Sequence, residues 1–514
     1  MYNKAPFATW VPKPLMLLFI IIILFPVMSI SGVYVGSATD IAGGLAMYNE
    51  YIALANNATT IGMSLSMLIV LRVKMRFRTK EIITTSALAL ALLSLMIANT
   101  DNQYVLVACS LLIGFFKMFP LIEMILPVMF ILSPTGDKGK FYAFFYPLSI
   151  IAGQYGTYLF TNMVYDSNYQ APYYIMAIIM LIIALISLVF QHNQRFSFKL
   201  PLYQVDWLSM ILVGISAMSL NVGLTFMKQQ AWFNSPLVVN SLLLSIVVFI
   251  LLVIRQKYVK RPFFNFKEFY QRSNVAHSLI LLTFLGFYLS SSSVFTQYVV
   301  GVLEYNNPIN AGLNLWMIPG IILAGALAFI GFKNKWNIKW YIAAGFVSFF
   351  LHTVSLYFLM QMQMDISYLE YSMILKGLGM GILFIGIWFY ASLDIPMDKI
   401  FGIMCILLMY RTFISTAFAG AIINWATYQS QWQSLSDISM YLDTNAIQNA
   451  MSMFKTINLN ALMASGKIVL GALSWLIIPI LIFVLAHHYG QFNNRRLVFF
   501  RKLIKGNSVK GYKF

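Results

Sequence analysis

Four ionisable side chains stand inside long apolar runs of this 514-residue sequence. Lys117 and Glu123 share one run, while Lys376 and Arg411 each fall in another. A charged side chain in the middle of a bilayer costs from about 2.5 kcal/mol upward, so it normally faces a water-filled cavity or a partner of opposite charge. The chemistry open to these residues is therefore proton transfer or the binding of a charged ligand. The alternative is ion pairing that ties helices together.

Glu123 is the first candidate for a proton-coupling carboxylate. It follows Lys117 by six residues, which turns the two side chains about 120° apart on a helix, so they do not form a same-face pair. Pro120 lies between them and is expected to bend the helix. Glu123 is therefore free to meet a cation on another helix or to take up a proton. Asp40 and Glu50 are second choices, because both can belong to an outer loop.

Membrane-spanning helices must position these residues. The sequence is 60% apolar and only 10% charged, whereas soluble domains carry about 25% charged residues. Apolar runs long enough for a span recur along the chain and predict about fourteen transmembrane helices, the first near 14–36. This composition excludes a soluble enzyme, a nucleic-acid-binding domain and an outer-membrane barrel, whose strands alternate in polarity. The expected fold is an all-α integral membrane protein.

The placement of the basic residues predicts the orientation. The net charge is +18, and most Lys and Arg residues fall in alternate loops that include Arg72 and Arg76 and in the tail 491–514. Asp101 and Asp166 lie in the loops between. By the positive-inside rule, this asymmetry predicts an even number of spans with both termini in the cytoplasm. Membrane topology thus explains the charge, and no nucleic-acid partner is expected.

Three groups of motifs along the chain share residues with one family of membrane proteins. They comprise 204–208, 232–236 and 261–264 around two central spans, then 297–301 and 307–312, and finally 376–381 with Arg411 in the next span. This pattern resembles the fourteen-helix drug/proton antiporters of the major facilitator superfamily, the EmrB/QacA-type exporters. Two family signatures are altered. The loop after the second span keeps Arg72 and Arg76 without the usual aspartate and glycines, and the fifth span has Gly153 and Gly156 with Pro147 earlier.

The resemblance implies an organisation and a site. It implies a six-helix bundle in 1–199, two extra helices in 200–272, a second six-helix bundle in 273–490 and a basic cytoplasmic tail in 491–514. In this superfamily, Lys117 and Lys376 would face one central cavity from opposite halves. The expected substrate-binding residues are Lys117, Lys376, Arg411, Gln154, Tyr155 and Gln297. The expected gating or packing residues are Arg72, Arg76, Pro120, Gly153, Gly156, Gly377, Gly379 and Gly381.

The function predicted from these features is secondary active transport in the cell (inner) membrane. The expected reaction is proton-coupled efflux of an amphipathic small molecule by alternating access. Three mid-depth cations against one acid favour an anionic substrate with an apolar body, such as a fatty-acid-like, bile-salt-like or phenolic anion. An importer or uniporter of the same fold, or a membrane sensor that has lost transport, remains the alternative. No metal-ligand spacing, phosphate loop or nucleophile motif occurs, so no metal, cofactor or enzymatic activity is expected.

The outer segment 429–465 has an amphipathic pattern, with apolar residues at near-helical intervals. It is expected to lie on the membrane surface or to cap the protein. The resemblance offers a second interpretation, in which this segment docks a periplasmic adaptor that works with an outer-membrane channel.

Overall fold

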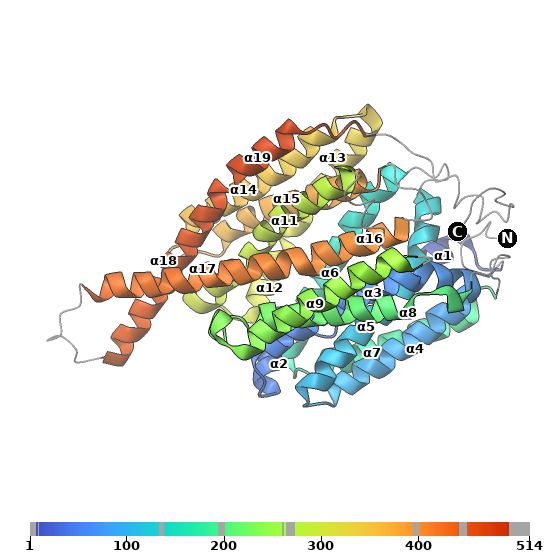
Figure 1. The fold of residues 1–514 in the computed structure, drawn as a ribbon, viewed down its shortest axis with the longest axis horizontal. Helices are drawn as coiled ribbons and strands as arrows, with labels where there is room; N and C mark the ends of the chain where they lie inside the picture. Colours follow the sequence, from blue (N-terminus) through green and yellow to red (C-terminus); the bar gives the residue numbers. More distant parts are fainter. Residues whose placement is uncertain are drawn as a thin grey trace.

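Long helices make up almost all of the chain that the computed structural model describes (Figure 1). The described residues are 7–492, except 9, 133–137, 194–200, 260–261, 264–272, 394–399 and 441–449. Nearly all of the expected tail 491–514 and parts of the linkers around the central helices therefore lie outside them. Within the described residues there are two isolated β-bridges and no strand.

Twelve of the described helices are long and apolar enough to cross a membrane. Two further long helices fall outside this set. One is α1 (Lys13–Ser29), which has only 17 residues, and the other is α6 (Lys138–Asp166), which carries polar residues such as Gln154 along its length. The protein is thus a multi-pass all-α membrane protein, because helices of this length and hydropathy satisfy their backbone groups internally in lipid.

We call the helices up to α7 the N-terminal helices. They are α1, a short α2 (Ala38–Gly44), α3 (Asn49–Arg76), α4 (Thr79–Ala98), α5 (Gln103–Leu132), α6 and α7 (Ala171–Phe190). The helices from α11 onward are the C-terminal helices. They are α11 (Ser273–Thr296) with the π-helical turn η4 (Gln297–Val302), α12 (Asn307–Leu315), α13 (Met317–Asn334), α14 (Ile338–Leu359), α15 (Ser367–Ala391), α16 (Ile400–Met409) with the π-helical turn η5 (Tyr410–Ile414), α17 (Ser415–Ser439), α18 (Ala450–Trp475) and α19 (Ile477–Ala486).

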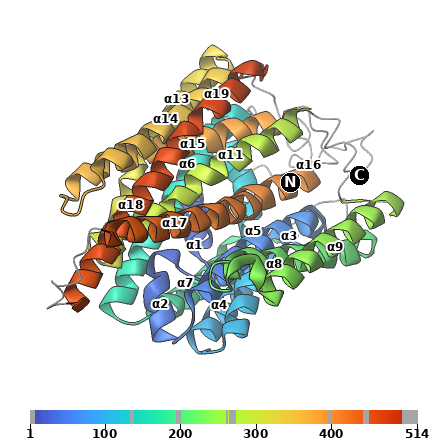
Figure 2. The same cartoon turned by 60° about the vertical axis from the view of Figure 1, so that its left-hand side comes forward.

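Two helices, α8 (Trp207–Phe226) and α9 (Pro236–Tyr258), form a hairpin in which α8 packs against both α3 and α17 (Figure 2). The Asn57 side chain of α3 donates a 2.9 Å hydrogen bond to Asn221 of α8. At the open end of the α8–α9 hairpin, Arg255 pairs with Asp206 at 2.7 Å. Burial alone would raise the pKa of Asp206, but the hydrogen bonds from Arg255 and Ser209 hold it below its ordinary value.

Glycines allow the closest helix contacts in both groups. A Cβ atom on Gly114 of α5 would overlap the carbonyl oxygen of Thr59 on α3. In the same way, a Cβ atom on Gly377 of α15 would overlap the carbonyl oxygen of Met317 on α13. Small residues let helix backbones approach closely in membranes. The pairs α3–α5 and α13–α15 are therefore the tightly packed cores of the two groups.

The first predicted span, near 14–36, is wrong in its second half. Helix α1 ends at Ser29, the chain is extended at Ile30, and a 3₁₀ turn (Val35–Ser37) leads into α2. The start of the broken segment is enclosed, with Ile30 and Val33 both 0% exposed. Irregular backbone is tolerated at membrane depth only where protein or water covers it, so the neighbouring helices must satisfy its polar groups.

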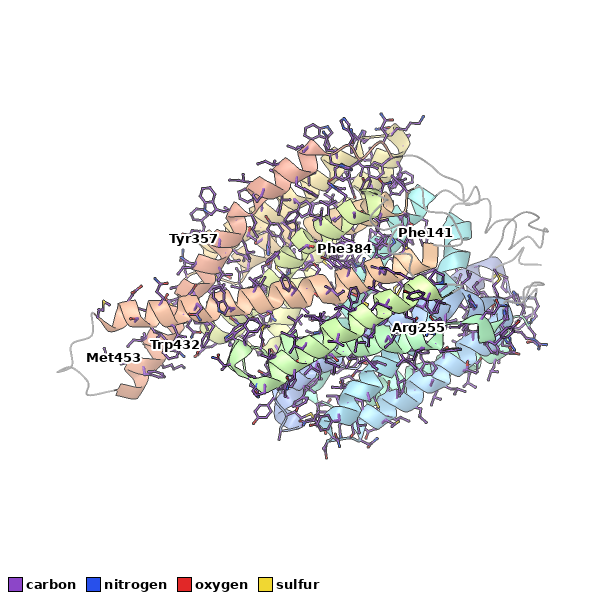
Figure 3. All side chains as sticks on the ribbon, in the orientation of Figure 1. Phe141, Arg255, Tyr357, Phe384, Trp432 and Met453 are labelled. Carbon is purple, nitrogen blue, oxygen red and sulfur yellow. The ribbon has the colours of Figure 1, made fainter. Side chains whose placement is uncertain are left out.

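The outer segment 429–465 also differs from the prediction. Its described residues continue the spans: α17 runs on to Ser439 and α18 begins at Ala450. The two helices contact each other and project beyond the rest of the molecule, where Figure 3 labels Trp432 and Met453. The described apolar residues of this pattern, such as Trp432 and Phe454, thus belong to two long helices that pack together. The rest of the pattern, in 441–449, lies outside the described residues.

Candidate functional site

A cavity of about 290 Å³ lies between the N-terminal and C-terminal helices. Helices α3, α5 and α6 line one side, and α15, α16 and η5 line the other. Figure 3 labels one residue from each side, Phe141 and Phe384. We call this the central cavity. Four methionines line it together with six aromatic side chains, which are Phe141, Tyr142, Phe145, Tyr146, Phe384 and Trp388.

Arg411 is the one charged side chain among the residues that line the central cavity. It stands in the π-helical turn η5, a distortion that often marks functional positions in helices. Its guanidinium carbon lies 4.5 Å from the ring centroid of Phe384 and 5.2 Å from that of Trp388. Its Nε atom is buried without a hydrogen-bond partner. The cavity is therefore an aromatic chamber with one cation in its wall.

A second, larger hollow of about 640 Å³ also lies between α6 and the C-terminal helices. Tyr158 and Asn162 near the end of α6, Pro308 at the start of α12 and Glu370 in the first turn of α15 are among its lining residues. It lies at the ends of these helices, whereas the central cavity is lined by the opposite end of α15 and the first turns of α6. The two hollows thus lie toward opposite ends of one contact region between the helix groups.

Glu123 pairs with a cation on another helix, which its spacing from Lys117 left possible. Its Oε2 atom accepts a 2.8 Å hydrogen bond from Lys74 Nζ in the last turns of α3. The two side chains are only 3% and 7% exposed. Glu123 follows Ile122, which lines the central cavity, so this buried ion pair joins α3 and α5 directly behind the cavity wall.

Lys117 does not line the central cavity. Its Nζ atom donates hydrogen bonds of 2.8 Å to the carbonyl oxygen of Met28 and 2.6 Å to that of Ile30. These are free carbonyl groups at the C-terminal end of α1, where the helix dipole favours a cation. In the same broken segment, the hydroxyl of Tyr173 on α7 donates a 3.1 Å hydrogen bond to the carbonyl oxygen of Gly32. Lys117 therefore holds the broken end of α1, and its role in substrate binding stays a prediction.

Lys376 is also absent from the lining of the central cavity, so this cavity does not bring the two lysines together. It is 4% exposed within the C-terminal helices, and its Nζ atom lies 5.8 Å from the ring centroid of Phe295. His352 is close enough to interact with it electrostatically and is hydrogen-bonded through Nδ1 to Ser372. The described residues place no carboxylate within ion-pair distance of Lys376.

The other candidate binding and coupling residues are dispersed. Asp40 accepts a 2.8 Å hydrogen bond from Asn307 and so connects α2 to the start of α12. Glu50 lies in the first turn of α3. Three further residues do not line the central cavity: Gln154 is half-buried on α6, Tyr155 is 42% exposed and packs edge-on against Phe25, and Gln297 begins the π-helical turn η4.

The candidate gating residues are also separated. Arg72 donates a hydrogen bond of 3.3 Å to the carbonyl oxygen of Pro201, whereas Arg76 is exposed at the end of α3. Pro120 is buried in α5, which continues as a helix through it. Of the five candidate glycines, Gly153 has open space around its Cβ position. A Cβ atom at any of the other four would clash with a neighbouring helix; these are Gly156, Gly377, Gly379 and Gly381.

Sequence reasoning missed the two aromatic partners of Arg411 and the partner of Glu123. Phe384 and Trp388 are four residues apart, which places them on one face of a helix, but the sequence does not tell whether that face meets lipid or a cavity. Lys74 stood in a cluster of basic residues expected to belong to a loop, and α3 extends through it to Arg76. Among the described residues, no group of three or more His, Cys, Asp or Glu side chains is arranged to hold a metal.

Comparisons with known proteins give a result at the level of structure. No protein-family model matches the chain, and no curated protein matches its sequence. The nucleoside transporter NupG shares 12% identity and a TM-score of 0.55, over 92% of this chain and 99% of that chain. The peptide transporter POT, solved in complex with sulfate, shares 16% identity and a TM-score of 0.57, over 94% of this chain and 98% of that chain. At these identities the likeness shows the fold alone, which this chain shares with these two transporters.

Proposed function

We propose that the chain is a secondary transporter that moves an amphipathic small molecule across the membrane by alternating access. The observation that carries this proposal is the central cavity, which both helix groups line and which lies at their contact. A cavity of mostly apolar lining with few polar groups is the usual form of a small-molecule site. The second hollow at the other end of the same contact supports the idea that the two groups rock about a site between them.

The proposal includes fourteen spans with both termini in the cytoplasm. Helices α1 and α6 complete six N-terminal spans, the α8–α9 hairpin adds two, and the C-terminal helices supply six. Lys74 and Arg76 end α3, Arg255 and Lys257 end α9, and Lys333 lies in the last turn of α13. By the positive-inside rule these ends face the cytoplasm. The division into units 1–199, 200–272 and 273–490 follows this arrangement.

Coupling to protons is assigned to Glu123 in its pair with Lys74. A buried carboxylate that pairs with a lysine is stabilised by that cation, and its protonation would break the ion pair. Because the pair joins α3 to α5 behind the cavity wall, protonation would loosen a contact that borders the substrate. Export, rather than import, follows from the resemblance to drug/proton antiporters, and the cell inner membrane is the corresponding location.

Flux through reconstituted liposomes tests the proposal. The purified full chain is reconstituted, a proton gradient is imposed, and a panel of fluorescent amphipathic anions, cations and neutral compounds is followed across the membrane. We expect protein-dependent flux of at least one class that collapses when the gradient is dissipated. Flux against the direction of proton entry identifies an exporter, and flux along it identifies an importer.

Variants connect that flux to the central cavity. Ser149→Trp fills space in the cavity, whereas Phe144→Trp introduces the same side chain on an exposed face of the same helix. We expect Ser149→Trp to remove the flux and Phe144→Trp to retain it. Equal flux in both variants, or no protein-dependent flux of any class with folded protein, would contradict the proposed function.

A further inference from the structure

We propose that the central cavity binds a small apolar carboxylate and that Arg411 holds its carboxylate group. This inference rests on the proposed transport function and narrows it to one substrate class. It replaces the sequence-based idea of a site with three cations, because Lys117 and Lys376 lie elsewhere.

The hydrogen-bonding capacity of Arg411 is unused by the part of the chain that the structure describes. A guanidinium has five N–H donors, yet Nε is buried without a partner, and none of the ion pairs among described residues includes Arg411. The guanidinium carbon lies 4.5 Å from the ring centroid of Phe384 and 5.2 Å from that of Trp388. Such cation–π contacts are made with the ring faces and supply no oxygen or nitrogen acceptor, so the N–H donors stay available to an acceptor on a ligand.

The charge of Arg411 calls for a negative group in the cavity. Placing an ion in a low-dielectric interior costs more free energy than cation–π contacts return. A carboxylate offsets the rest of this desolvation cost through two parallel charge-assisted hydrogen bonds, the arrangement that fits the edge of a guanidinium. A lipophilic cation in the same cavity would instead face an unpaired positive charge.

The rest of the cavity fits an apolar body of limited size. Its aromatic walls provide stacking surfaces, and its four methionines, Met63, Met67, Met118 and Met404, adapt to irregular shapes. A volume of 290 Å³ is at the lower edge of the range of about 300–1,000 Å³ for ligand pockets. The cavity therefore favours an arylalkanoate or a medium-chain carboxylate over an anion of steroid size.

Calorimetric titration of the full chain in lipid nanodiscs tests this assignment with three matched probes. Phenylacetate, phenylacetamide and phenethylammonium present the same ring with a negative, a neutral and a positive group. A hydrogen bond to a charged group is worth about 1.5–3 kcal/mol, so we expect phenylacetate to bind about tenfold to a hundredfold more tightly than the amide. We expect the ammonium probe not to bind. Hexanoate should bind like phenylacetate if an aliphatic body is accepted.

Two variants of Arg411 localise the effect. Arg411→Gln should remove the preference for the carboxylate over the amide, and Arg411→Lys should retain part of it, because a lysine keeps the charge and loses the bidentate geometry. Lys333→Gln removes the same charge from an exposed position at the end of α13 and should behave like the parent. Unchanged affinity for phenylacetamide in Arg411→Gln shows that the cavity remains folded.

The outcomes separate this inference from the transport function. Equal binding of carboxylate and amide by the parent, or an undiminished carboxylate preference in Arg411→Gln, would overturn the assignment. Protein-dependent flux of cations or neutral compounds but not of carboxylates would also overturn it while the transport function stands. Carboxylate binding that depends on Arg411, without flux of any compound, would support the site and contradict transport.

Discussion

Replacing Lys117 with methionine should destabilise the broken end of α1. The change removes the hydrogen bonds to the carbonyl oxygens of Met28 and Ile30. A buried acceptor left without a partner costs about 1–3 kcal/mol, so the two carbonyls together cost about 2–6 kcal/mol. Methionine no longer requires the burial of an ammonium group, which offsets part of this loss. We therefore expect a net loss of about 2 kcal/mol, equivalent to a change of roughly thirtyfold in the local opening equilibrium.

The two buried cysteines allow a direct measurement of that opening. Cys109 lies on α5 with Lys117, next to Ser110, which packs against Gly32 in the α1 break. Cys405 lies on α16. A thiol reagent reacts with a buried cysteine only when the surrounding structure opens. In Lys117→Met, the modification rate of Cys109 should rise about thirtyfold and exceed any change at Cys405.

The control is Lys333→Met, the same substitution at an exposed position at the end of α13. It should leave both modification rates at their parental values. A Lys117→Met variant that protects Cys109 as well as the parent does, or better, would refute the reasoning. In that case the burial of the ammonium would cost as much as its two hydrogen bonds contribute, and Lys117 would not be what holds the break.

Three further predictions concern coupling, packing and topology. Glu123→Gln should abolish transport driven by a proton gradient while leaving substrate counterflow measurable; an active variant with unchanged pH dependence would exclude Glu123 from coupling. Gly377→Ala should lower the thermal unfolding midpoint because its Cβ atom would overlap the backbone of α13, whereas Gly153→Ala, with open space around it, should leave the midpoint unchanged; equal midpoints would contradict the packing argument. In a cysteine-free background, cysteines at Asn334 and Gln433 should label only from the cytoplasmic and only from the outer side, respectively, and the reverse pattern would overturn the topology.

The sequence was sufficient to predict the all-α membrane class, because long apolar runs in lipid have few other solutions. It could not reveal the break in α1. Apolar residues, among them Ile30, Val33 and Tyr34, continue after Ser29, so the apolar run does not end where the helix ends. What permits the break is tertiary: Lys117 and Tyr173 satisfy its carbonyls, and Gly32 packs against Ser110 where a Cβ atom would clash.

The types of residue in the candidate site could be predicted from the sequence, but only some of the residues that form the site could be. The charged residues predicted at mid-depth are Lys117, Glu123, Lys376 and Arg411. Each of them makes a defined contact with a backbone carbonyl, an opposite charge or an aromatic ring. Whether each one faces a cavity, a backbone or another side chain depends on helix rotation, which the composition of a nearly uniform apolar run does not encode. Arg411 alone of the predicted binding residues lines the central cavity.

Access to the central cavity from the two sides of the membrane is the most direct test of the alternating-access account, because it requires no knowledge of the substrate. A single cysteine replaces Ser149, which lines the cavity, in a chain lacking Cys109 and Cys405. Membrane-impermeant thiol reagents are then added to one side of sealed vesicles or to the other. The account predicts that the cysteine at position 149 reacts from each side, whereas a cysteine at Asn334 reacts from one side only. Reaction of the cavity cysteine from one side alone, with the folded protein in a fluid bilayer, would contradict it.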